Sequence, residues 1–167
     1  MKIIFLDIDW VLIRFWDTQQ IRKTRAEKLK GWLITSLDED LVDNLVKIIK
    51  QTNAYIVISS SWRHWLMEIL RDEFYKNWDR LSFDLWNRII SKTPSWLNHW
   101  RWNEILTWIN EYHKICKDWE HITNYVAIDD DSFDMKCINR LWKFVHTKTC
   151  EWLTKEKAQE VIEILNF

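Results

Sequence analysis

Residues 1–11 read MKIIFLDIDWV, and this stretch decides the fold. The unbroken apolar run at residues 3–6 is typical of a parallel strand that is buried on both faces. The run ends in Asp7, Ile8 and Asp9. In open α/β sheets, ligands bind beyond the carboxyl ends of the strands, so this pattern predicts two carboxylates at the mouth of a sheet. Taken alone, it fits a nucleophile with an acid–base partner about as well as a simple turn.

Two other stretches share this design. Residues 54–61, AYIVISSS, form a second apolar run that ends in three serines and is followed by Trp62 and Arg63. Residues 125–134, YVAIDDDSFD, form a third run that ends in an acidic cluster. In this order, the three motifs resemble those of haloacid dehalogenase superfamily phosphatases. The chain is most similar to the small domain that occurs alone or in RNA-repair polyproteins, and the resemblance runs nearly end to end.

The resemblance implies a phosphomonoester hydrolase that works through an aspartyl-phosphate. Asp7 would attack phosphorus, and Asp9 would protonate the leaving oxygen and then activate water. Ser59, the first hydroxyl after its strand, would contact a phosphoryl oxygen. The family also needs one cation at the phosphoryl group. Arg101 is the first choice for it, because the family reads RGEEI where this chain has RWNEI, and Lys92 is the second.

The acidic cluster predicts a metal site. Asp129, Asp130, Asp131 and Asp134 are too dense to lie close together without a cation or wide exposure to solvent. Carboxylates, waters and phosphate oxygens are the ligands of Mg²⁺. The resemblance implies Mg²⁺ as cofactor; the predicted metal residues are Asp7, Asp9, Asp129, Asp130 and Asp134. Which of Asp129 and Asp130 binds directly stays open, and a solvated acidic loop is the alternative.

The predicted fold is a three-layer α/β sandwich with a parallel, Rossmann-like sheet of about five strands. Strands are expected at residues 3–8, 55–59, 88–90, 124–128 and 143–146, and the resemblance implies the spatial order last, fourth, first, second, third. A capping box of Ser36 and Glu39 predicts a helix before the second strand. Helical spacing predicts two further helices, at 103–115 and 154–165. Ser60 and Ser61 could cap another helix after the second strand, with Arg63 on its exposed first turn. The apolar faces expected for the first three helices are Leu41, Leu45, Ile48 and Ile49; Ile105, Leu106, Ile109 and Tyr112; and Ala158, Val161, Ile162 and Leu165.

Length and composition narrow the class of protein. The 167 residues fit one domain, 1–167, and the net charge of −1 creates no field toward nucleic acid or membrane. Cys116, Cys137 and Cys150 form no Cys-x-x-Cys pair, and none of the five His falls at metal-ligand spacing. No signal peptide or membrane span is recognisable. We therefore expect a cytoplasmic protein that does not contact membranes.

The expected substrate follows from the small size of the domain. The gaps between motifs leave no room for a large cap, so the site should be open. An open site favours a phosphate on a large substrate, such as a nucleic-acid end, over a small metabolite, although nucleotides also remain candidates. Basic residues between positions 22 and 30 either contact a substrate backbone or form a solvated helix face. The alternative function is a non-catalytic module that binds phosphate or a partner.

Tryptophan usage is abnormal. The chain has 14 Trp and one Gly, where average usage predicts about 12 Gly. The family carries Gly where this chain has Trp at 10, 100, 102 and 152, whereas Trp at 62 and 108 match the family. We hypothesise a gene in which UGA encodes Gly but was translated as Trp; a genuinely Trp-rich protein is the alternative. Literal Trp are expected to strain turns, crowd the site and lie largely exposed.

Overall fold

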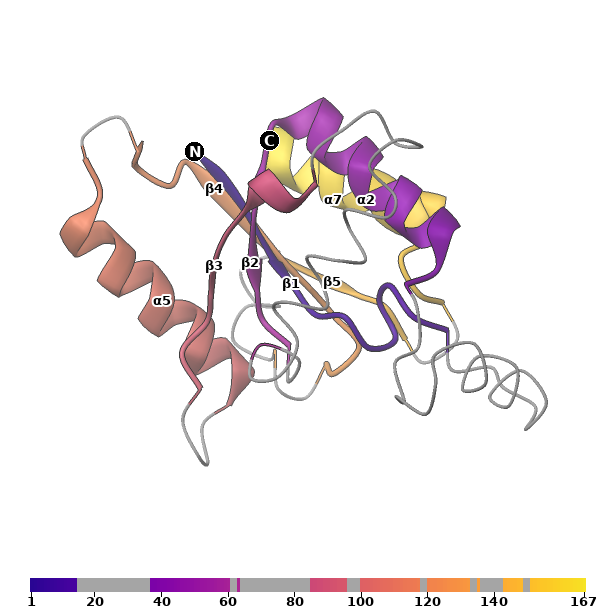
Figure 1. Ribbon diagram of the computed structural model, residues 1–167, viewed down its shortest axis with the longest axis horizontal. Helices are drawn as coiled ribbons and strands as arrows, with labels where there is room; N and C mark the ends of the chain where they lie inside the picture. The colour runs from indigo at the N-terminus through magenta and orange to yellow at the C-terminus, as the bar shows by residue number, and fades with distance from the viewer. Residues whose placement is uncertain are drawn as a thin grey trace.

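The computed structural model describes residues 1–14, 37–60, 63, 85–95, 100–117, 120–132, 135, 143–148 and 151–167. Within these ranges, five strands form one sheet in the order β3-β2-β1-β4-β5, and every neighbouring pair is parallel. The predicted fold class and strand order are therefore confirmed (Figure 1). The strands are β1 (Lys2–Leu6), β2 (Tyr55–Ile58), β3 (Ile89–Lys92), β4 (Asn124–Asp129) and β5 (Phe144–His146).

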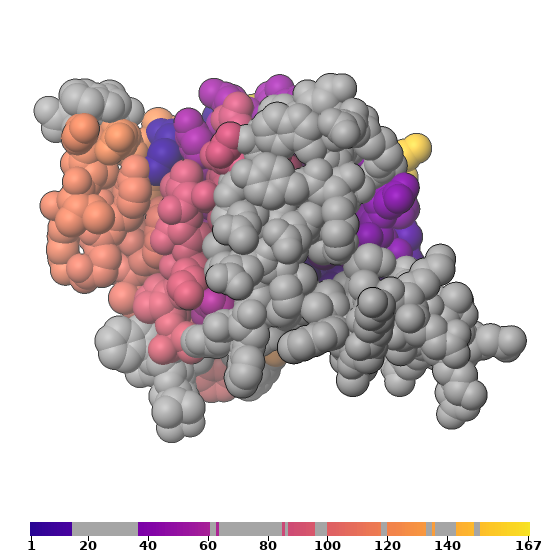
Figure 2. All heavy atoms as spheres, viewed as in Figure 1, coloured from indigo at the N-terminus to yellow at the C-terminus, as the bar shows by residue number. Residues whose placement is uncertain are grey.

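Each strand differs from its predicted bounds by one or two residues at one end or both, and two of these differences have clear local reasons. β1 stops at Leu6 rather than Ile8, because the chain turns there and the Ile8 carbonyl accepts the Leu12 amide at 2.9 Å. β3 begins at Ile89 because the preceding residues form a short 3₁₀ turn, η2 (Trp86–Arg88). β3 is one of the two edge strands of the sheet, the other being β5. Figure 2 shows the atoms of β3 beside those of α5 (Arg101–Ile115) on this face of the molecule.

The sheet is covered on both faces, as the continuous apolar strands require. Successive side chains of a strand point to opposite faces, so Ile4 and Leu6 pack with α2 (Glu39–Thr52) and α7 (Lys155–Asn166), while Ile3 and Phe5 pack under α5. Figure 1 shows this three-layer arrangement. The helix faces predicted from apolar spacing are buried: Leu41, Leu45, Ile48 and Ile49 in α2, and Ala158, Val161, Ile162 and Leu165 in α7.

The starts of two helices correct the predictions. The N-cap of α2 is Asp38, whose carboxylate accepts the Arg14 amide at 2.6 Å rather than capping the helix. The predicted capping partner Ser36 lies outside the described residues. α5 begins two residues earlier than expected, at Arg101.

The predicted inward face of α5 is confirmed except at Leu106. Ile105 is fully buried, and Ile109 and Tyr112 are partly buried and pack against the same core, whereas Leu106 is partly buried and is not among the residues that pack there. Trp108 takes the remaining core position: its ring meets that of Phe5 edge to face, and its indole N–H donates to the Ser91 hydroxyl at 3.0 Å. Trp108 therefore has the contacts of a native core tryptophan, as its match to the family implied.

The four tryptophans at presumed glycine positions divide into two groups by backbone conformation. Trp10 has φ 57° and Trp152 has φ 43°, in the left-handed region that glycine adopts without steric cost. Trp100 has φ −67° and Trp102 lies in the first turn of α5, so neither backbone requires glycine. The glycine hypothesis thus gains backbone support at two positions of four. The prediction that these side chains lie largely exposed is wrong for Trp102 and Trp152, which pack against the two hydrophobic cores.

Several expectations fall on residues that the structure does not describe. They are the basic residues between positions 22 and 30, Trp62, and the helix expected to follow Arg63. Among the helices that can be described, none combines the length and the apolar character that a membrane crossing needs.

Candidate active site

Three of the predicted site residues lie at the edge of the sheet formed by the carboxyl ends of three neighbouring strands. The strand ladder continues one residue past β1 and β2: the Asp7 amide donates to the Ile128 carbonyl at 3.0 Å, and the Ser59 amide donates to the Leu6 carbonyl at 2.8 Å. Asp129 is the last residue of β4, which pairs with β1 on its other side. The register of the parallel strands therefore sets Asp7 between Ser59 and Asp129.

Three carboxylates converge at this edge. One oxygen from each of Asp7, Asp129 and Asp130 lies within 4.8 Å of the others. Asp7 and Asp129 are 4% and 1% exposed, so little water screens their charges. The Asp131 amide donates to an Asp129 carboxylate oxygen at 2.9 Å and fixes the orientation of that side chain.

A single guanidinium bridges two of these carboxylates. The Nη1 atom of Arg101 lies 3.1 Å from Asp7 Oδ1 and 3.5 Å from Asp129 Oδ2. Arg101 is the first residue of α5, and this position brings it across the end of β1. Burial lowers the pKa of Arg101, but the charges of Asp129 and Asp7 outweigh burial, and the pKa is raised overall. The guanidinium is therefore charged at any physiological pH.

Burial raises the pKa of all three carboxyl groups, and neighbouring carboxylates raise it further for Asp129 and Asp130. Burial raises the pKa of Asp7, although Arg101 and a hydrogen bond from the Ser60 hydroxyl oppose it. Burial and the charge of Asp7 raise the pKa of Asp129 well above its ordinary value. The same two causes raise the pKa of Asp130 to about 6. One guanidinium is thus insufficient to balance three carboxylates.

The donor set at this edge suits a hard divalent cation. All three groups offer carboxylate oxygens, which Mg²⁺ prefers, and their excess negative charge is what a divalent ion would neutralise. Asp129 Oδ2 is buried, and its only counter-charge among the described residues is Arg101. Asp7, Asp129 and Asp130 therefore fit Mg²⁺, and they are the described residues that would hold it.

Two serines after β2 take different positions. The Ser59 hydroxyl is buried, and within the described part of the chain it has no hydrogen-bond partner, as expected of a group that awaits a ligand oxygen. The neighbouring Ser60 hydroxyl donates to the Asp7 carboxylate. The sequence predicted a phosphate contact for Ser59 but only a helix cap for Ser60, because three consecutive serines do not reveal which one turns toward Asp7.

A buried ion pair supports this serine loop. Arg63 was expected on an exposed helical turn, but it is only 6% exposed, and its guanidinium lies 2.7 Å from the Glu104 carboxylate in α5. The same guanidinium donates to the Ser60 carbonyl at 2.9 Å. The pair thus joins the serine loop to the helix that carries Arg101. No pattern in the sequence links residues 63 and 104, so only the structure reveals it.

Two other predicted residues are described, and neither is one of the three converging carboxylates. Lys92, the second choice for the phosphate cation, is exposed, and its ammonium donates to the Arg63 carbonyl at 3.0 Å. Asp9 lies on the turn after β1, where it forms a backbone bridge with Ile13. Its carboxylate does not belong to the group of three. Asp134 lies outside the described residues.

Comparison with known proteins identifies the family. No curated protein and no solved structure matches the chain. The family model described as the HAD domain in Swiss Army Knife RNA repair proteins matches residues 3–158. This match covers all three motif strands and every residue of the carboxylate site described above. The chain therefore belongs to this family of haloacid dehalogenase domains, whose superfamily consists mostly of phosphatases.

Proposed function

We propose that this protein is a Mg²⁺-dependent phosphomonoester hydrolase that acts through an aspartyl-phosphate on a nucleic-acid end. The observation that carries the proposal is the convergence of Asp7, Asp129 and Asp130 around Arg101 at the carboxyl edge of the sheet. A buried carboxylate held beside a fixed cation can attack phosphorus while the cation stabilises the charge of the phosphoryl oxygens.

In the first step, an Asp7 oxygen forms a bond to phosphorus, and the bond from phosphorus to the ester oxygen breaks. Asp9 gives its proton to that leaving oxygen. The Arg101 guanidinium and the buried Ser59 hydroxyl donate hydrogen bonds to the phosphoryl oxygens. The hydrogen bond from Ser60 and the ion pair with Arg101 favour the ionised form of Asp7, which is the nucleophilic one.

In the second step, Asp9 accepts a proton from water, and the water oxygen attacks the phosphorus of the aspartyl-phosphate. The bond to Asp7 breaks, inorganic phosphate leaves, and Asp7 is again a carboxylate. Mg²⁺, when bound by Asp7, Asp129 and Asp130, reduces the charge repulsion between the nucleophile and the phosphate dianion.

The substrate class rests on the family and on the size of the domain. The family is described from RNA repair proteins, and the stretches between the three motifs are too short for a large cap. A phosphate at the end of a nucleic acid can approach such a site while the rest of the polymer stays outside. We infer an RNA end as the substrate, in preference to a free nucleotide.

The direct test measures release of phosphate from an aryl phosphate and from an RNA oligonucleotide with a terminal phosphate, with and without Mg²⁺. We expect turnover only with Mg²⁺ and a higher kcat/KM for the oligonucleotide than for the matching mononucleotide. With a labelled aryl phosphate, whose leaving group needs no acid, Asp9→Asn should accumulate phosphoprotein, because the second step lacks its base. Asp7→Asn should form no phosphoprotein.

Two results would contradict the proposal. Full activity of Asp7→Asn would remove the nucleophile assignment. Binding of phosphate and Mg²⁺ by correctly folded wild-type protein without any turnover would instead favour the non-catalytic binding module. Asp43→Asn, an equivalent change on the exposed side of α2, is the matched control and should keep normal turnover.

A further inference from the structure

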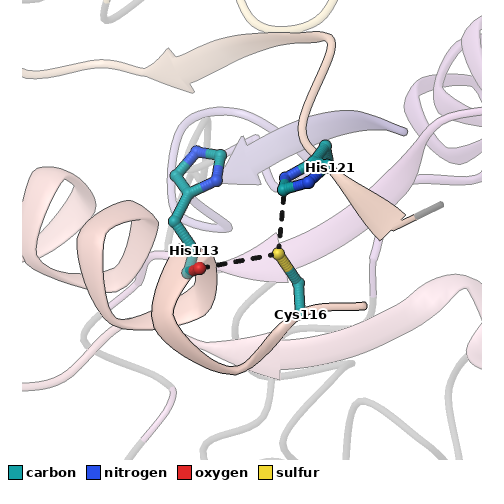
Figure 3. Close-up of side chains that lie close together, drawn as sticks. All are labelled: His113, Cys116 and His121. Carbon is teal, nitrogen blue, oxygen red and sulfur yellow. Dashed lines mark hydrogen bonds between the residues drawn. The ribbon is translucent and has the colours of Figure 1, made fainter. Parts of the chain in front are cut away.

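A second group of potential metal ligands lies at the opposite edge of the sheet, where α5 ends and β4 begins. His113 is in the last turn of α5, Cys116 is its C-cap, and His121 precedes β4. Figure 3 shows the two imidazole rings and the thiol close together. The imidazole rings are stacked with centroids 6.1 Å apart.

The backbone holds these side chains in place through several hydrogen bonds. The Cys116 amide donates to the Tyr112 carbonyl at 2.9 Å and completes the end of the helix. The Glu120 amide donates to the Lys117 carbonyl at 2.8 Å, which closes a tight turn back toward the sheet. The amino group of Met1 then donates to the His121 carbonyl, so the start of β1 anchors the third residue.

The distances match those of a transition-metal site. One ligand atom from each of His113, Cys116 and His121 lies within 4.8 Å of the other two. The Cys116 sulfur is 3.6 Å from His121 Nδ1. In a tetrahedral zinc site, a sulfur at about 2.3 Å and a nitrogen at about 2.1 Å from the ion lie about 3.6 Å apart. Without metal, the same contact is a hydrogen bond between the thiol and the imidazole.

We propose that His113, Cys116 and His121 form a Zn²⁺ site with three protein ligands. A thiolate with two imidazoles suits Zn²⁺ and excludes Mg²⁺, which prefers oxygen ligands. Zn²⁺ would bind the sulfur in place of its proton, and the proton would go to solvent. Three protein ligands leave the fourth tetrahedral position for water or another ligand. The partly exposed cluster admits the ion from solvent.

The zinc site would be separate from the phosphatase site. Arg101 begins α5 and the cluster lies at its other end, so a helix of 15 residues puts them about 20 Å apart. Zn²⁺ there would connect the end of α5 to the segment before β4 and would stabilise that junction. Spacing along the chain did not predict the cluster, because a tight turn brings His121 back over the helix end.

The test titrates purified protein with Zn²⁺ by calorimetry, in excess Mg²⁺ so that the acidic group at the carboxyl edge is occupied. We expect one Zn²⁺ per chain with a dissociation constant of about 1 µM or lower. Cys116→Ser and His121→Asn should each weaken binding more than about 100-fold, since even the loss of a residue behind the ligands costs about 10–100-fold. Cys137→Ser, which removes a thiol elsewhere in the sequence, is the matched control.

A second measurement detects the thiolate ligand in the unaltered protein. Co²⁺ bound by the wild-type protein should show a thiolate-to-metal charge-transfer band, and Zn²⁺ should displace it. Folding of each variant is checked by circular dichroism. The proposal fails if Co²⁺ gives no thiolate band, if Zn²⁺ does not bind in the presence of Mg²⁺, or if folded Cys116→Ser and His121→Asn bind Zn²⁺ like the wild type.

Discussion

The two edges of the sheet carry metal-ligand groups of opposite character. At the carboxyl edge, Asp7 and Asp129 are buried, offer oxygen atoms, and are balanced in part by Arg101. At the amino edge, His113 and Cys116 lie near the surface and offer nitrogen and sulfur. Burial makes the first group unfavourable without a cation, whereas the second group is stable in water with or without one.

Among the described residues, this difference makes the carboxyl edge the better candidate for an active site. Catalysis by charge stabilisation needs groups that are fixed and shielded from water, and the strand register supplies that rigidity at the carboxyl edge. At the amino edge, the ligand groups lie on a helix end and beside a turn, where water reaches them. The predictions below test the contrast, in order of expected effect.

The largest effect is expected for Asp129→Asn. Loss of this carboxylate weakens Mg²⁺ binding and should lower kcat/KM by about 10³-fold, equivalent to several kcal/mol of transition-state stabilisation. Removal of Mg²⁺ with a chelator should have a similar effect on the wild type. The thiolate band of bound Co²⁺ should remain in Asp129→Asn. Loss of both properties together would show that the two edges are not independent.

Arg101→Ala should lower kcat/KM by about 10²–10³-fold, because a buried cation no longer stabilises the phosphoryl oxygens. Arg101→Lys should recover only part of the loss, since an ammonium lacks the planar, fixed donor geometry of a guanidinium. Steady-state kinetics would measure both. Lys92→Ala should cost less than about 10-fold, because the Lys92 ammonium contacts the Arg63 carbonyl instead. If Lys92→Ala lowered kcat/KM as much as Arg101→Ala does, Lys92 would have to be counted among the phosphate-binding residues.

The difference in stability between a glycine and an alanine variant should have opposite signs at two sets of unusual tryptophans: Trp10 and Trp152 on the one hand, and Trp102 on the other. At Trp10 and Trp152, beside the carboxyl edge, Gly should be more stable than Ala by about 1 kcal/mol, because φ is positive. At Trp102, in α5, Gly should be less stable than Ala by about 1 kcal/mol. Denaturant unfolding of the six variants measures this.

The comparison with alanine removes the effect of losing the indole, so the difference reports backbone strain alone. A preference for Ala at Trp10 and Trp152 would contradict the glycine hypothesis for both. UGA codons at 10 and 152, with UGG at 108, would support the hypothesis independently. Trp10→Gly should also raise the phosphatase rate, because the indole lies one residue from Asp9 at the candidate site.

The smallest effect concerns pH. Burial and neighbouring charge raise the pKa of Asp130 to about 6 in the folded, metal-free protein, against 3.8 for the ordinary carboxyl. Its contribution to stability is therefore fully present below pH 3.8 and is lost as pH rises through 6. Solvent screening limits the loss to about 1 kcal/mol. In the presence of a chelator, Asp130→Asn should make the free energy of unfolding depend less steeply on pH between pH 4 and 7. An unchanged slope would contradict the raised pKa of Asp130.

The sequence alone determined the fold class, the strand order through its resemblance, and the edge at which the acidic residues gather. Those features depend on local patterns, because a buried parallel strand needs an unbroken apolar run and its last residues must lie at the carboxyl edge. The apolar spacing of α2 and α7 likewise predicted which residues are buried. The family model over residues 3–158 confirmed the resemblance.

Only the tertiary structure decided which side chains touch. The Arg63–Glu104 pair, the hydrogen bond from Ser60 to Asp7, and the cluster of His113, Cys116 and His121 join segments that no periodicity relates. Such contacts depend on how a loop or helix end is oriented after packing, and burial then determines how strongly their charges interact. A sequence records which groups are available, but distance and exclusion of water decide their chemistry.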